Sequence, residues 1–211
     1  MILNLENIDE IHLDVFREIG NIGSSSAATA LSKIVDKRIK LSLPHVKILK
    51  FNEITDTVGG EETLVLGVLQ PMQGDLNGNI MFLLGLKQAH DLASIVLSRM
   101  LNYTKPETEL GVFNEMEMSA LREIGNIMIS SYISAISSMT NLKIIPKAPE
   151  MALDMAAAIL SVLTIEFGKI GNHVLYISSE FSQDNVKVGG DFFLVPDIAS
   201  YDTLLRALGV V

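Results

Sequence analysis

Two short stretches of this 211-residue chain place a carboxylate and an amide three positions apart. Glu18 precedes Asn21 and Glu123 precedes Asn126, and in both places the residues between them are Ile and Gly. Because each helical residue turns by about 100°, this spacing puts both side chains on one helix face, away from the apolar stripe. A glutamate and an asparagine on a solvated face are usually only a polar surface, so the pair alone leaves its chemistry open.

Both copies also contain residues that weaken a helix. Asparagine costs roughly 0.5 kcal/mol relative to alanine in a helix interior, and glycine costs up to about 1 kcal/mol. Gly20 and Gly125 stand beside the two asparagines. Local helix stability is therefore given up in both copies, and one structural reason would be close packing where two long helices cross.

The same sequence disfavours several other kinds of chemistry. It has no cysteine, so disulfides, thiolate nucleophiles and cysteine-ligated metals are excluded. Its four histidines are dispersed without helical ligand spacing, which argues against a metal site. The segment 20–26 lacks the Gly-Lys-Ser/Thr ending of a phosphate-binding loop, and no Gly-x-Ser-x-Gly nucleophile motif occurs.

The chain repeats itself at an offset of 105 residues. Twelve of the thirty positions from 15 to 44 are identical to the positions 105 residues later. Internal similarity of this kind indicates a duplicated unit. We therefore predict a single domain, 1–211, built from two repeats at about 8–104 and about 113–211 that share one core with pseudo-two-fold symmetry.

The elements that position the polar pairs follow from periodicity and turn residues. Long helices are expected at 9–36 and 113–140, the first with an apolar stripe that includes Val15, Ile19, Ile22 and Ala30. Shorter helices are expected at 87–100 and 197–208, with 149–158 ambiguous between helix and strand. Strands are expected at 45–51, 63–70, 77–86, 143–145, 159–167, 172–181 and 190–195, with a hairpin turn at 169–172. The fold class is therefore α+β, or layered α/β, with a largely antiparallel sheet on which two long helices pack.

The amino-acid composition limits the kinds of partner that the protein can bind. Hydrophobic residues make up 48% of the chain, enough for a sizeable core, and the net charge of −9 disfavours binding to a phosphate backbone. The acidic start lacks the basic region of a secretory signal, and the charge-free stretch 124–142 is too polar to span a bilayer. We expect a cytoplasmic protein that binds neither nucleic acid nor membrane. A monomer is favoured, because two internal repeats already supply what a homodimer would.

A longer pattern surrounds each polar pair. The two copies are Asp14-x3-Glu18-x2-Asn21-x22-Pro44 and Ser119-x3-Glu123-x2-Asn126-x22-Pro149. This pattern resembles that of the CheC-type chemotaxis phosphatases, the family of CheC, CheX and FliY, and both copies match it at every position. Two such helices in a chain of this length are most similar to the CheC branch.

The resemblance implies hydrolysis of the aspartyl phosphate of CheY, the response regulator of flagellar rotation. Asn21 and Asn126 would hold a water in line with phosphorus, and Glu18 and Glu123 would engage the regulator, through an ion pair with its active-site lysine. The protein would need no cofactor of its own, because the Mg²⁺ would belong to the regulator. Asp14 and Ser119 would shape the partner contact, while Pro44 and Pro149 would terminate or orient the next segment.

The resemblance also implies binding of CheD, the receptor-modifying deamidase, with Asp154 as a weak candidate contact on the ambiguous segment. Two other functions stay open at this point. One is a non-catalytic chemotaxis adaptor that docks CheD or a regulator by the same fold. The other is a small-molecule sensor, which would require an enclosed pocket with convergent polar groups.

Overall fold

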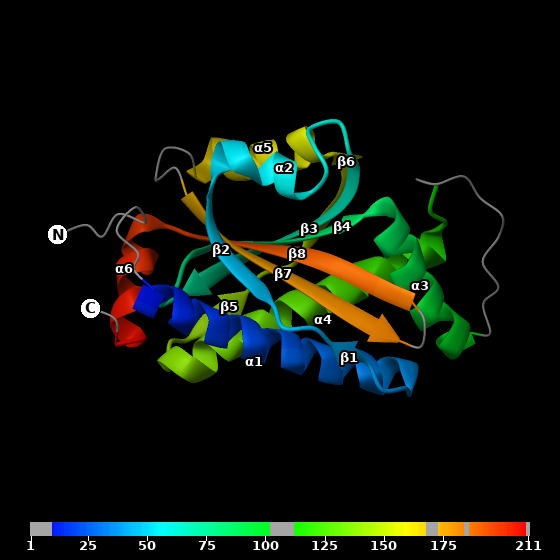
Figure 1. Cartoon of the computed structure of the whole chain (residues 1–211), viewed down its shortest axis with the longest axis horizontal. Coiled ribbons are helices and arrows are strands. Elements are labelled where there is room, and N and C mark those ends of the chain that lie inside the picture. The colour runs from blue at the N-terminus through cyan, green and yellow to red at the C-terminus, as the bar shows by residue number, and fades with distance from the viewer. Residues whose placement is uncertain (1–9, 102–111, 168–172, 184–185, 210–211) are drawn as a thin grey trace.

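The computed structural model of the chain describes residues 10–101, 112–167, 173–183 and 186–209 (Figure 1). Its centre is an eight-stranded sheet in the order β1-β7-β8-β4-β3-β5, with β2 also paired to β7 and β6 to β3. Every pairing is antiparallel, which confirms the predicted α+β class. The strands are β1 Lys40–Leu41, β2 His45–Lys50, β3 Leu64–Gly74, β4 Gly78–Gly85, β5 Ile144–Pro146, β6 Glu150–Met155, β7 His173–Gln183 and β8 Val186–Pro196.

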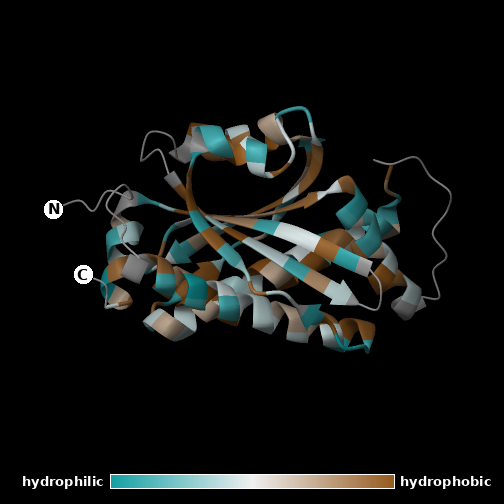
Figure 2. Cartoon of the chain, in the orientation of Figure 1, coloured by the Kyte–Doolittle hydropathy of each residue, from teal (hydrophilic) through white to brown (hydrophobic). Residues whose placement is uncertain are grey.

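Helices cover both faces of this sheet (Figure 1). Two 26-residue helices, α1 (Glu10–Val35) and α4 (Glu115–Thr140), lie side by side on one face, with α3 (Leu86–Leu101) and α6 (Ile198–Ala207) beside them. The short helix α2 (Ile54–Thr57), which follows a 3-10 turn, and α5 (Ala156–Phe167) cover the opposite face. Two hydrophobic clusters result, one on each side of the sheet. Figure 2 shows β3 and β4 hydrophobic along most of their length, as two-sided burial requires.

The two halves of the chain contain the same order of elements. Each has a long helix, two short strands, a helical segment, a β-hairpin and a closing helix. The halves meet at the β4–β8 pair, where Phe82 lies opposite Phe192 and their rings stack at 4.6 Å. The outer strands are exchanged, because β2 pairs with β7 and β6 pairs with β3. This symmetry is what a duplication would leave, although duplication itself stays a prediction.

One segment prediction was wrong, and one that had been left open is resolved. Residues 159–167, expected as a strand, belong to helix α5. In the ambiguous segment 149–158, residues 150–155 form strand β6 and residues 156–158 begin helix α5. Along α5 the buried and exposed apolar residues alternate with helical spacing, because Ile159 and Leu163 are buried while Val162 is exposed. A short apolar run does not distinguish strand from helix by periodicity alone. The predicted turn at 169–172 lies outside the described residues.

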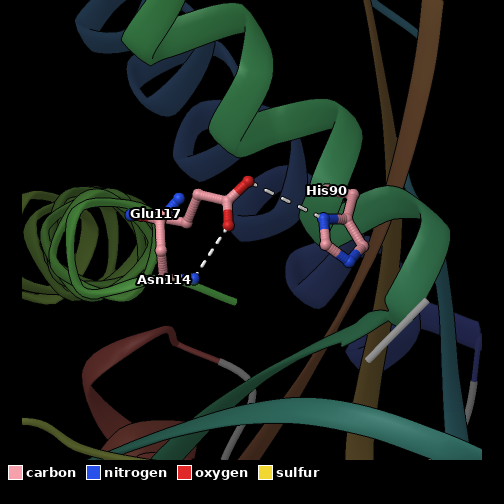
Figure 3. A network of polar contacts seen from close by, with 3 residues as sticks. All are labelled: His90, Asn114 and Glu117. Atoms are coloured by element: carbon pink, nitrogen blue, oxygen red, sulfur yellow. Dashed lines mark hydrogen bonds and ion pairs between the residues drawn. The ribbon is translucent and has the colours of Figure 1, made fainter. Parts of the chain in front are cut away.

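A buried polar contact sets the start of α4 (Figure 3). Asn114 caps the helix by accepting from the Glu117 backbone N–H, and the Glu117 carboxylate accepts from the Asn114 N–H in return. The other oxygen of Glu117 lies 3.9 Å from Nδ1 of His90 on α3, and both side chains are buried. Phe113 stacks on the His90 ring with centroids 4.0 Å apart. The N-terminus of α4 is therefore tied to α3.

Candidate functional site

The buried side of α1 combines large apolar residues, such as Phe16 and Leu31, with several small residues. Gly20, Gly23 and Ser24 are buried, whereas Val15 and Ile22, expected in the apolar stripe, are only half-buried. The expected stripe was therefore partly wrong. The prediction missed the buried glycine and serine positions because these residues contribute little hydropathy. Their small side chains nevertheless let a helix approach its neighbours most closely. The polar row on the opposite side is unaffected by this correction.

Glycines bring both long helices close to the sheet. A Cβ at Gly20 would lie 3.3 Å from Pro44 and Val46 and 3.5 Å from Ile177. A Cβ at Gly125 would lie only 2.7 Å from a methyl of Val68 on β3. Pro44 of the longer pattern therefore packs beside the helix turn that holds Asn21.

The helix crossing depends on a different glycine. A Cβ at Gly23 would overlap the ring of Tyr132 on α4, at 2.5 Å from its nearest atom. The Tyr132 hydroxyl lies 2.5 Å from the Ser24 hydroxyl and 2.9 Å from that of Ser179 on β7, and the two serines are themselves 2.9 Å apart. Burial raises the pKa of Tyr132 above its ordinary value of 10.0. A closed hydroxyl network thus joins α1, α4 and the sheet.

The first polar pair lies on the outer side of α1. Glu18 is exposed and Asn21 is half-buried, one helical turn apart. Asp14, one turn before Glu18, is also exposed, and its carboxylate accepts a hydrogen bond from Arg17. The negative charge of Asp14 is therefore partly neutralised within the same helix.

The second polar pair has the same placement on α4. Glu123 is exposed and Asn126 is half-buried, with Ser119 exposed one turn before Glu123. Arg122 occupies the position that corresponds to Arg17, but serine at 119 offers it no carboxylate. The two surfaces therefore share their central pair and differ in charge at their first position.

A residue that the sequence analysis did not single out contacts the second pair. Gln70 on β3 is 2% exposed. Its Nε2 donates to Oδ1 of Asn126 at 3.3 Å and to the backbone carbonyl of Lys147 at 2.9 Å. The sequence contained one signal for this contact, which is a glutamine within the apolar run of β3. A buried amide requires hydrogen-bond partners, so a partner for Gln70 was to be expected.

An open groove adjoins the long helices. It has a volume of about 560 Å³ and is lined by Ser25, Ser26, Thr29, Ala30, Lys33, Ile34 and Ile127. Ile127 follows Asn126 directly and Ser25 is one turn beyond Asn21, so the groove borders both polar rows. Lys33 supplies a cation at its lining.

Neither a metal cluster nor a membrane helix is found in the described part of the chain. No group of three or more His, Asp and Glu side chains there is arranged to hold a metal ion. None of the described helices combines the length and the apolar run that a bilayer crossing requires.

Comparison with solved structures defines the class of fold. The Thermotoga maritima FliY structure superposes with a TM-score of 0.72 at 20% identity, covering 95% of this chain and 99% of that one. The FliM middle domain from Helicobacter pylori gives 0.65 at 13% identity, covering 95% and 99%. The chain therefore has the fold of these FliY and FliM structures.

The sequence comparisons give the family. The sequence model of the CheC-like family matches residues 11–48 and 116–151, which contain the two polar pairs. A Bacillus subtilis relative named "CheY-P phosphatase CheC" is 32% identical over 206 residues, 96% of each chain. The chain belongs to the CheC-like family.

Proposed function

We propose that this protein hydrolyses the aspartyl phosphate of phosphorylated CheY in the cytoplasm. The observation behind the proposal is the 32% identity, over 96% of each chain, to a relative named a CheY-P phosphatase. It is supported by an exposed glutamate and a half-buried asparagine one turn apart on each of two long helices.

The chemistry asks little of the helper protein. An acyl phosphate is already activated, so acceleration comes from positioning and electrostatic stabilisation. Water attacks phosphorus, the bond from phosphorus to the aspartate oxygen breaks, the carboxylate leaves, and the water protons remain on inorganic phosphate. Asn21 and Asn126 position the water, because an amide forms hydrogen bonds without acting as a base. The regulator supplies the Mg²⁺, and this chain supplies no cofactor of its own.

The placement of the side chains suits these separate roles of the glutamates and the asparagines. Glu18 and Glu123 project into solvent, where they meet the lysine of the regulator first. Asn21 and Asn126 lie closer to the helix surface and need the regulator to approach before they reach its phosphate. Asp14 and Ser119 border the contact, and the Arg17 ion pair of Asp14 makes the two contact surfaces unequal.

The test is the decay of phosphorylated CheY with substoichiometric amounts of the protein. We expect the wild type to accelerate decay with turnover, Asn21→Ala and Asn126→Ala each to reduce it, and the double variant to abolish it. Ser138→Ala, an exposed change on α4 outside both pairs, is the matched control and retains full activity. Acceleration that survives in the double variant would remove the asparagines from the mechanism.

We also propose that the protein binds CheD, with Asp154 at the contact. Asp154 lies on strand β6, not on the short helix considered from the sequence, and it is exposed beside the exposed Met155 and Leu64. An exposed carboxylate with apolar neighbours is suited to a protein contact. The alternative function is a non-catalytic adaptor, and stoichiometric CheD or regulator binding without any acceleration, even with CheD added, would favour it.

A further inference from the structure

We propose that Gln70 is a positioning residue that orients the Asn126 amide with its N–H groups facing the regulator. The inference rests on the proposed function and deepens it at the second polar pair. Gln70 does not touch the substrate, since it is 2% exposed beneath α4. It acts through its hydrogen bond to Asn126.

A backbone carbonyl determines the direction of the whole contact. The carbonyl of Lys147 can only accept, so the Gln70 atom that lies 2.9 Å from it must be the donor Nε2. The same nitrogen has a second hydrogen, directed to the Asn126 atom at 3.3 Å. That atom must in turn accept, so it is Oδ1. The orientation of both amides therefore follows from one unambiguous acceptor.

The Lys147 carbonyl is itself held in place. Lys147 follows β5, and its backbone N–H donates to the carbonyl of Pro71 at 2.8 Å, next to Gln70 on β3. The segment after β5 is thus attached to β3 by a backbone bond and by the Gln70 side chain. A fixed acceptor and a buried donor restrict the rotation of the Asn126 side chain before any partner arrives.

This orientation specifies what Asn126 offers to the reaction. With Oδ1 turned toward Gln70, Nδ2 is the end left for the regulator. An N–H donated to the attacking water leaves the water a lone pair for phosphorus. Preorganised donors are effective because no reorganisation is needed at the moment of reaction.

The first polar pair lacks this support. His45 on β2 and Glu150 on β6 are corresponding residues of the two repeats, 105 positions apart. His45 pairs with Ser178 on β7, and Glu150 pairs with Leu69 on β3. The next residues in the two strands, Ser179 and Gln70, therefore occupy corresponding positions. Ser179 bonds to Ser24 and Tyr132 instead. Among the described residues, none forms a hydrogen bond with the side chain of Asn21.

The experiment uses two single-site forms of the full chain. Asn21→Ala leaves the second pair active and Asn126→Ala leaves the first. Gln70→Leu is added to each, since leucine keeps most of the buried volume without a donor, and Gln70→Met replaces it if the leucine variant unfolds. Decay of phosphorylated CheY gives kcat and KM, and thermal melting confirms folding.

We expect Gln70→Leu to lower kcat about tenfold with unchanged KM in the Asn21→Ala form, as loss of one positioning hydrogen bond implies. In the Asn126→Ala form both constants stay unchanged. Equal losses in the two forms would show a merely structural role and overturn the proposal. Unchanged kcat in the Asn21→Ala form, or a change confined to KM, would overturn it as well.

A second readout separates this inference from the proposed function. In the NMR spectrum of the wild type, the Asn126 side-chain amide should have a higher order parameter than that of Asn21, and Gln70→Leu should lower it. Equal order parameters would refute the positioning role whatever the activity. If the order parameters behave as expected but no form accelerates phosphate decay, the proposed function fails while the geometric relation stands.

Discussion

The two helix glycines give a matched test of how the long helices are seated. We expect Gly125→Ala to destabilise the protein and Gly20→Ala to leave it equally stable or slightly more stable. Both changes add one methyl at corresponding positions of the two repeats. They differ in what that methyl meets on the sheet.

The magnitudes follow from the distances. A Cβ at position 125 would lie 2.7 Å from Val68, and ordinary contact begins at 3.4 Å, so the helix and strand must separate by about 0.7 Å. A Cβ at position 20 requires a displacement of only about 0.1 Å, because the nearest atoms would lie 3.3 Å from it. Overpacking typically costs about 1–3 kcal/mol, against a helix gain of up to about 1 kcal/mol for alanine. Gly125→Ala should therefore lose about 1 kcal/mol and Gly20→Ala should gain a fraction of that.

Thermal unfolding followed by circular dichroism measures both variants. In a chain of this size 1 kcal/mol shifts Tm by about 2–4 °C, so the two midpoints should lie several degrees apart. The displacement also moves α4 away from β3 and stretches the bond from Gln70 to Asn126, so phosphatase activity at the second pair should fall. A Gly125→Ala protein as stable as Gly20→Ala would refute the assignment of Gly125 to close packing on Val68.

Three further predictions concern buried polar groups. Tyr132→Phe should cost about 1 kcal/mol in urea unfolding, since Ser24 and Ser179 can still bond to each other, whereas a loss near 4 kcal/mol would contradict this. Glu117→Ala should cost about 1–3 kcal/mol because the Asn114 N–H loses its acceptor, and Glu117→Gln, which keeps one, should cost less in the same assay. Burial raises the pKa of Asp191, so this carboxyl favours the folded state below its ordinary pKa of 3.8 and loses that contribution as pH rises. Asp191→Asn should therefore gain stability relative to wild type with rising pH in Tm measurements, and a constant difference would count against it.

Much of the fold was accessible from the sequence because its strongest signals are local. The long helices were predicted within one residue of their observed ends at three of the four termini, and two residues at the start of α4. Helix α5 was predicted as a strand because its apolar run is short, and its helical state depends on the cluster that it covers. Strand β6 was left open between helix and strand, because its six residues have no clear period. Val65 opposite Asp154 is a pairing between the two halves, which no local pattern encodes.

The candidate site was likewise only partly predictable from the sequence. The spacing of Glu123 and Asn126 places both on one face, and the structure shows that face turned outward. Gln70 lies 56 residues away in sequence and reaches Asn126 only through the seating of α4 on β3. A buried glutamine signals that a partner exists but does not name it.

The exchange of strands between halves explains why the two polar pairs differ. Helix α4, from the second half, rests on β3 of the first through Gly125 and Val68, while α1 of the first half approaches Ile177 on β7 of the second. Each long helix therefore packs on a strand from the other half, although α1 also packs on Val46 of β2 in its own half. A substitution at Gln70 on β3 changes the surroundings of Asn126, whereas Ser179 on β7 contacts Ser24 on α1. The two halves thus differ at corresponding strand positions, with glutamine at position 70 and serine at position 179. As a result, two helices with the same Glu-Ile-Gly-Asn sequence present unequally supported amides.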